Sequence, residues 1–91
     1  MALSTIDFVK ARDTVAELLD ELALEAYLFE VEPRNSHWEV KVECAITEGW
    51  ETVTLSIPKE VLLASADDKV IRKQVLEEWR ARLAACKIQS S

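Results

Sequence analysis

The most constraining feature of this sequence is a stretch in which apolar and polar residues alternate with a period of two. It runs from Tyr27 to Ile57 in three segments, which two short polar segments, 33–36 and 47–49, interrupt. Successive side chains of a β-strand point to opposite faces, so each segment predicts a strand with one apolar face. Pro, Asn, Ser and Gly in the interruptions are typical of tight turns. The sequence therefore predicts three strands joined as an antiparallel meander.

The two predicted turns also set a register for the sheet. A four-residue loop at 33–36 and a two-residue loop at 48–49 place Val40 across from both Phe29 and Ile57. Apolar residues then share one face of the sheet. A shift of one residue would move them to the opposite face, so the alternation and the turns support each other.

A helical period precedes the strands. Apolar residues recur at three- and four-residue steps between Phe8 and Leu22, and charged residues occupy the opposite side. This pattern predicts an amphipathic helix that starts at Ser4 or Thr5 and ends near Glu25. No glycine follows the pattern to cap the carboxyl end of this helix.

The C-terminal third predicts a second long helix. Pro58 ends the third strand because it cannot donate a hydrogen bond to a neighbouring strand, and a short helical turn is expected at 59–63. The segment 65–68 resembles a capping box, from which an apolar stripe continues to about Lys87. We expect residues 88–91 to form a frayed tail.

These elements follow one another in the order α-β-β-β-α. A sheet with one apolar face needs a cover, and both helices carry one apolar stripe. We therefore predict an α+β fold, a two-layer sandwich in which a three-stranded antiparallel meander has both helices packed on one face. A chain of 91 residues has room for one such core, so residues 1–91 are expected to form a single domain.

The net charge limits the classes of partner. The chain carries 17 acidic and 11 basic side chains, which gives a net charge of -6. Modules that bind nucleic acid are usually basic, so this charge argues against nucleic acid as a partner. It also argues against an anionic membrane surface, and no apolar run is long enough to span a bilayer. With no segment that resembles a signal peptide, the sequence predicts a cytoplasmic protein.

Catalytic and cofactor chemistry finds little support in the sequence. Cys44 and Cys86 both fall in apolar stripes, and we expect buried free thiols there, with a disulfide as the alternative. One histidine and no CxxC motif leave no zinc site of the usual spacing, and one glycine leaves no phosphate-binding loop. We therefore predict no metal, no cofactor and no enzymatic activity.

The solvent face of the predicted sheet carries the candidate interaction residues. Alternation places several acidic side chains there, and the predicted register sets Glu30 across from Glu39. A leucine and a tryptophan share this face, and exposed aromatic residues are typical of interface cores. Such a face either keeps the chain soluble or binds a basic partner. The residues of this candidate protein-interaction site are Leu28, Glu30, Glu32, Glu39, Glu43 and Trp50.

Two local patterns resemble the double-stranded-RNA-binding domain, which has the same order of elements. Residues 18–22 look like the end of that family's first helix, and residues 33–42 look like its loop between the first two strands. In the family, this loop reaches a minor groove and the start of the last helix grips phosphates. Here that helix begins with Asp67 and Asp68, which departs from the family's lysine cluster. The resemblance implies the candidate RNA-binding residues Arg34, Asn35, His37, Lys69, Arg72 and Lys73.

The sequence thus predicts a small acidic cytoplasmic protein that acts as a non-enzymatic protein-interaction module, of adaptor or chaperone-like type. Its expected partner is another protein or a second copy of the chain, because unpaired strand edges and exposed aromatic residues favour such contacts. A diverged double-stranded-RNA-binding domain is the alternative function.

Overall fold

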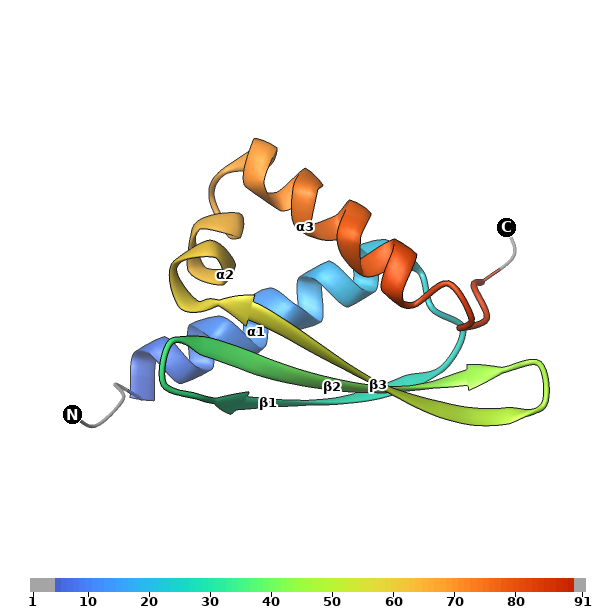
Figure 1. The fold of residues 1–91 in the computed structure, drawn as a ribbon. Coiled ribbons are helices and arrows are strands. Elements are labelled where there is room, and N and C mark those ends of the chain that lie inside the picture. The colour runs from blue at the N-terminus through green and yellow to red at the C-terminus, as the bar shows by residue number, and fades with distance from the viewer. Residues whose placement is uncertain (1–4, 90–91) are drawn as a thin grey trace.

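Residues 5–89, which a computed structural model describes, form three helices and one sheet (Figure 1). The elements are α1 (Thr5–Leu22), β1 (Tyr27–Pro33), β2 (His37–Ile46), β3 (Gly49–Pro58), α2 (Lys59–Ser65) and α3 (Lys69–Arg82). No helix within these residues has the length and apolar character needed to cross a bilayer.

The fold has two layers. The strands lie in the order β1-β2-β3 and pair antiparallel, and Figure 1 shows the helices together on one side of them. The α+β class, the order α-β-β-β-α and the placement of the long helices on one face are therefore confirmed. The short turn expected at 59–63 is the first part of α2.

The core lies between the sheet and the helices. Its largest fully buried side chains include Trp38 from β2 and Trp79 from α3. Leu18 and Leu19 of α1 pack in the same cluster, together with Leu62 of α2. Each helix thus contributes its apolar stripe to one continuous core, which stabilises the two layers against each other.

The register of the sheet differs from the predicted one by two residues. Val40 lies across from Val31 and Leu55, where Phe29 and Ile57 were expected. A shift of two residues leaves every side chain on its predicted face, because the side-chain period of a strand is two.

The cause of this difference lies in the turns. The backbone N–H of Arg34 donates to the carbonyl of His37 at 2.8 Å, so the first hairpin closes around Asn35 and Ser36 alone. In the second hairpin, Ile46 pairs with Gly49 and the loop is residues 47–48. The positive φ of Gly49, 110°, suits glycine at the start of β3.

Helix α1 ends earlier than the expected position near Glu25. Ala23 adopts a left-handed conformation with φ of 57°, and its N–H donates to the carbonyl of Asp20 at 3.1 Å. A left-handed residue is the usual way to stop a helix, although glycine is the usual residue there. The chain then turns so that Leu24 is buried.

Helix α3 also has different ends from those predicted. Asp68 is its N-cap and accepts hydrogen bonds from the N–H groups of Val70 and Ile71, at 2.9 and 3.1 Å. Ser65 instead belongs to α2, where its hydroxyl donates to the carbonyl of Leu62. The helix stops at Arg82, about one turn before the expected end.

The segment after α3 returns to the sheet. Ile88 forms an antiparallel bridge with Leu24, and the N–H of Gln89 donates to the carbonyl of Ala23 at 2.8 Å. The N–H of Lys87 donates to the carbonyl of Ala45, also at 2.8 Å. The expected frayed tail is therefore wrong for residues 88 and 89, and residues 90 and 91 lie outside the described part.

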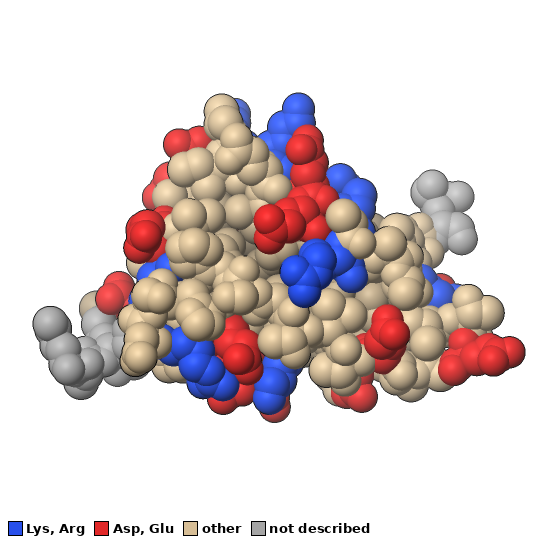
Figure 2. All heavy atoms as spheres, in the orientation of Figure 1, with Lys and Arg blue, Asp and Glu red and all other residues tan. Residues whose placement is uncertain are grey.

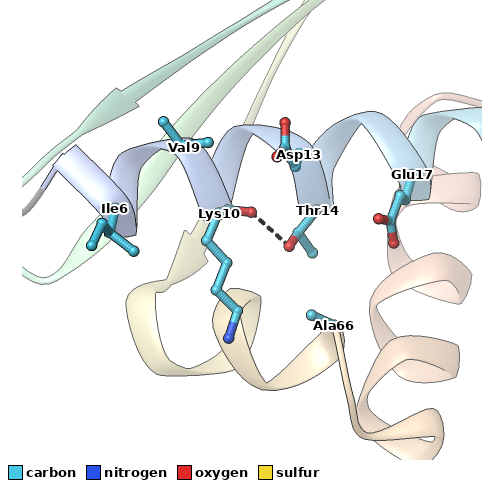
Figure 3. Close-up of a pocket in the computed structure, with 7 residues that line it drawn as sticks. All are labelled: Ile6, Val9, Lys10, Asp13, Thr14, Glu17 and Ala66. Atoms are coloured by element: carbon cyan, nitrogen blue, oxygen red, sulfur yellow. Dashed lines mark hydrogen bonds between the residues drawn. The ribbon is translucent and has the colours of Figure 1, made fainter.

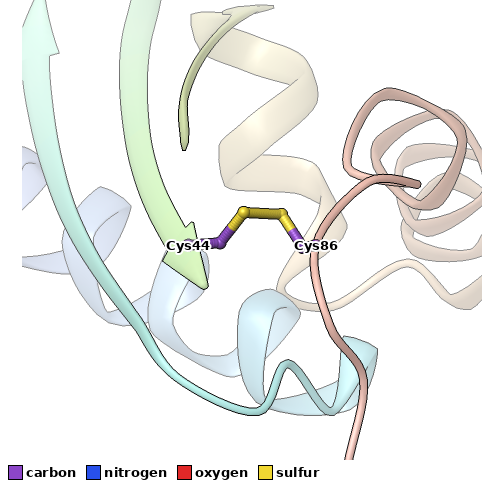
Figure 4. The surroundings of a disulfide bond; sticks show 2 residues. All are labelled: Cys44 and Cys86. Carbon is purple, nitrogen blue, oxygen red and sulfur yellow. A yellow bond between two sulfur atoms is a disulfide. The ribbon is translucent and has the colours of Figure 1, made fainter. Parts of the chain in front are cut away.

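The two cysteines form a disulfide (Figure 4). Cys44 lies on the inner face of β2 and Cys86 lies in the returning segment, with their Cα atoms 5.6 Å apart. The expectation of free thiols is wrong, because α3 ends early enough to bring Cys86 over the end of the sheet. Both residues are buried in the core.

Candidate functional site

The face of the sheet turned away from the helices, here the outer face, holds the candidate interaction residues. The pairing sets Leu28, Glu43 and Thr52 side by side across the three strands. Ala45 and Trp50 form the adjacent row, toward the β2–β3 hairpin. Strand geometry puts the Cα atoms of Leu28 and Trp50 about 12 Å apart, with only a glutamate and an alanine between them.

Two large apolar side chains are exposed on this face. Leu28 is 66% exposed and Trp50 is 54% exposed. Trp38 and Trp79 are buried, so Trp50 is the described tryptophan that solvent reaches. A shallow depression of about 430 Å³ lies beside Leu28, and Lys41, Glu43 and Thr52 contribute to its lining. Exposed apolar residues beside a depression offer contact area to a partner.

The carboxylates of the outer face divide into two groups, and the first is paired with cations. Glu32 lies across from Glu39, and Arg34 lies within salt-bridge distance of both, at 3.5 and 3.1 Å. Lys41 Nζ lies 3.6 Å from Glu32 Oε1. This end of the face is close to neutral.

The second group has no such partner. The predicted contact between Glu30 and Glu39 is wrong, since Glu30 lies across from Lys41. However, Lys41 reaches Glu32, and within residues 5–89 no cation comes within 4 Å of the carboxylates of Glu30 or Glu43. The uncompensated carboxylates therefore flank Leu28.

Sequence reasoning missed two further carboxylates near Trp50. Glu48 and Glu51 are exposed, and no salt bridge joins them to a cation in the described structure. Figure 2 shows acidic atoms at the end of the molecule where the β2–β3 hairpin of Figure 1 lies. Glu51 pairs with Cys44 and so occupies the inner face, where alternation predicts cover. The sequence does not show how far the β2–β3 hairpin extends relative to the helices, so it could not predict that Glu51 is exposed.

The residues proposed for RNA binding fall into two places. Arg34, Asn35 and His37 lie at the β1–β2 hairpin, where His37 is half-buried across from Pro58. Arg34 is held by Glu32 and Glu39. The guanidinium of Arg34 in this hairpin is therefore already paired with carboxylates.

The second place is the start of α3. Arg72 Nε donates to Glu21 Oε2 at 2.6 Å, and Arg72 Nη1 donates to Glu17 Oε1 at 3.4 Å. The hydrogen bond to Glu21 raises the pKa of the Arg72 guanidinium above its usual value, with burial acting in the opposite direction. Lys69 and Lys73 are exposed on the same helix. Arg72, the middle one of these three cations, therefore holds α3 against α1.

A second depression lies between α1 and the turn from α2 to α3 (Figure 3). Its volume is about 480 Å³, and exposed Ile6 and Val9 line it with Ala66. Thr14 at its wall donates its hydroxyl hydrogen to the carbonyl of Lys10 at 2.7 Å. Lys10, Asp13 and Glu17 also line it, so the depression combines apolar and charged side chains.

Within residues 5–89, no three His, Cys, Asp or Glu side chains gather as metal ligands would. Compared with protein-family models, with curated proteins and with solved structures, the chain matches none of them.

Proposed function

We propose that this protein is a non-enzymatic protein-interaction module, of adaptor or chaperone-like type, that binds a partner through the outer face of its sheet. The observation that carries the proposal is the exposure of Leu28 and Trp50 among carboxylates that have no cation beside them. Aromatic residues are enriched in interface cores, and complementary charge steers a partner to such a surface. The partner is therefore a protein segment that carries both apolar and basic side chains.

The proposal that the protein is not an enzyme rests on the state of its potentially reactive side chains. Both cysteines are joined in the disulfide, which removes them as thiolate nucleophiles. His37 faces Pro58 across the sheet, away from either sulfur. An interaction surface needs no such groups.

Double-stranded RNA binding stays the alternative prediction. The pairing of Arg34 and Arg72 with carboxylates and the capping of α3 by Asp68 argue against it, because phosphate contacts need free cations and free helix N–H groups. The net charge of -6 acts in the same direction.

The cytoplasmic location also stays a prediction, and the disulfide weighs against it. Disulfides persist in oxidising compartments and are rare in the cytosol. Trapping free thiols with an alkylating reagent during lysis of the native cells would report the state of Cys44 and Cys86. Alkylated cysteines would support the cytoplasm, and protected cysteines would point to an oxidising compartment.

The test of the proposed function compares two variants in one capture experiment. Trp50→Thr removes the exposed ring and keeps a residue suited to a strand. Val70→Thr removes another exposed apolar side chain, which lies on α3 and far from the outer face. Each is immobilised beside the original protein in extract of the native cells at physiological salt, with and without nuclease.

We expect the original protein to capture a partner protein in stoichiometric amount. The Trp50→Thr variant should retain this partner at least about tenfold more weakly, because truncation of an aromatic anchor commonly weakens binding to that extent. Val70→Thr should retain it fully. Equal retention by all three proteins, or no bound protein, would contradict the proposal. Bound RNA that nuclease removes would favour the alternative.

A further inference from the structure

The outer edge of β1 is an unpaired strand edge. In an antiparallel sheet, successive residues direct their N–H and C=O groups alternately to the two neighbours. The hydrogen bonds of Arg34 to His37 and of Ala45 to Ala26 show that even-numbered residues of β1 bond to β2. Tyr27, Phe29 and Val31 therefore direct their backbone groups away from the sheet, and no other described strand lies there.

The opposite edge of the sheet is better protected. Arg82 Nη2 donates to the outward carbonyl of Thr54 on β3 at 3.3 Å. The side chains beside this edge on the outer face are mostly polar, those of Thr52, Thr54 and Ser56. Proteins usually protect edges with cations, proline or a covering element. Between Tyr27 and Val31, β1 has none of these, and its proline comes only at the end.

The sequence of β1 is complementary to itself in one antiparallel register. If Phe29 faces Phe29 of a second copy, Tyr27 faces Val31 and Leu28 faces Glu30. The pairs of odd-numbered residues then each exchange two hydrogen bonds, and no carboxylate faces another.

The neighbouring registers are worse. A register centred on Glu30 places that carboxylate across from its own copy, and it gives Tyr27 a proline partner that has no N–H. A register centred on Leu28 leaves Val31 across from Glu25, whose N–H already donates to the carbonyl of Lys87, and so forms fewer hydrogen bonds. Phe29 is therefore the position that satisfies the most backbone groups without opposing charges.

Apolar side chains beside the edge add to this complementarity. Tyr27 and Phe29 are half-buried on the inner face, with ring centroids 6.3 Å apart. Centring the pair on Phe29 brings both rings against those of the second copy. On the outer face, the two Leu28 side chains become diagonal neighbours. Each copy thus covers apolar surface that its own fold leaves exposed.

We propose that two copies of this chain pair antiparallel through the edge of β1, centred on Phe29, and form one continuous six-stranded sheet. The pairing uses a strand edge and leaves Trp50 uncovered, so it does not depend on the proposed function. Since each copy carries a net charge of -6, added salt should strengthen the dimer by screening the repulsion between copies.

The test measures both mass and backbone protection in the protein alone. Sedimentation equilibrium should show a dimer, and hydrogen exchange followed by NMR should show slow amides at Phe29 and Val31. A monomer at the concentrations used for NMR would overturn the proposal. A dimer in which these two amides exchange rapidly would also overturn it, because another surface would then hold the copies.

A matched pair of variants tests the register. Leu28→Glu places a carboxylate across from Glu30 of the second copy, and we expect the dimer to dissociate roughly tenfold more readily. Thr52→Glu places the same new carboxylate beside Glu43, but at the β3 edge. Equal weakening by both variants would contradict the β1 pairing. Trp50→Thr leaves the β1 edge unchanged, so this variant should remain a dimer while it loses the partner in the capture experiment, and the two proposals are tested separately.

Discussion

At the scale of single residues, Ala23 is the backbone position that fits its residue least well. Its φ of 57° ends α1, and a left-handed alanine is less stable than a left-handed glycine. We expect Ala23→Gly to raise the free energy of unfolding by roughly 0.5–1 kcal/mol, after allowing for the greater freedom of glycine in the unfolded chain. Urea denaturation measures this. Ala84→Gly, at an exposed residue with no positive φ, is the control and should be destabilising.

Arg72 is the residue that joins α1 to α3 by charge. Its side chain is 22% exposed and lies within salt-bridge distance of Glu17 and Glu21. We expect Arg72→Gln to lower the free energy of unfolding by about 1 kcal/mol, less at high salt, since partly exposed ion pairs are screened. Lys73→Gln removes an exposed neighbouring charge and should have little effect. Equal losses in thermal denaturation of the two variants would show that the ion pairs are not responsible.

At the scale of elements, the disulfide fixes the segment after α3 to β2. Its cysteines are 42 positions apart, and closing a loop of that length reduces the entropy of the unfolded chain. We expect the double variant Cys44→Ala, Cys86→Ala to lose about 4 kcal/mol of unfolding free energy. The reduced original protein is the control in guanidinium denaturation. If it is as stable as the oxidised protein, the cross-link is not the source of the loss.

The elements also show what a sequence of this kind can predict. Alternation predicted the faces of the strands, and with them the exposure of Leu28 and Trp50, because neighbouring side chains must point oppositely. It could not select between registers that differ by two residues. The early end of α1 carried no signal, since an alanine stands where a glycine would mark the stop. The disulfide was only the alternative to free thiols, because it depends on where α3 ends.

At the scale of the whole molecule, the acidic surface should be measurable through Trp50. Two of the three tryptophans are buried, so quenching reports mainly on the exposed one. We expect caesium to quench it more strongly than iodide at low ionic strength, because Glu48 and Glu51 lie close to it in the chain and the net charge is -6. The difference should fade near 1 M salt, where the Debye length is about 3 Å. Trp50→Phe should abolish most quenching, and equal quenching by both ions would contradict the acidic environment.

The alternation of faces in the sheet also limits how the length of this chain can change. Inserting or deleting one residue within β2 would turn the rest of the strand over and expose the residues that fill the core. A change of two residues keeps each side chain on its face of the sheet and alters only which residues pair across the strands. Insertions and deletions in these hairpins are therefore expected to be tolerated when they change the length by an even number of residues. A change by an odd number should be tolerated only where a bulge absorbs the extra residue.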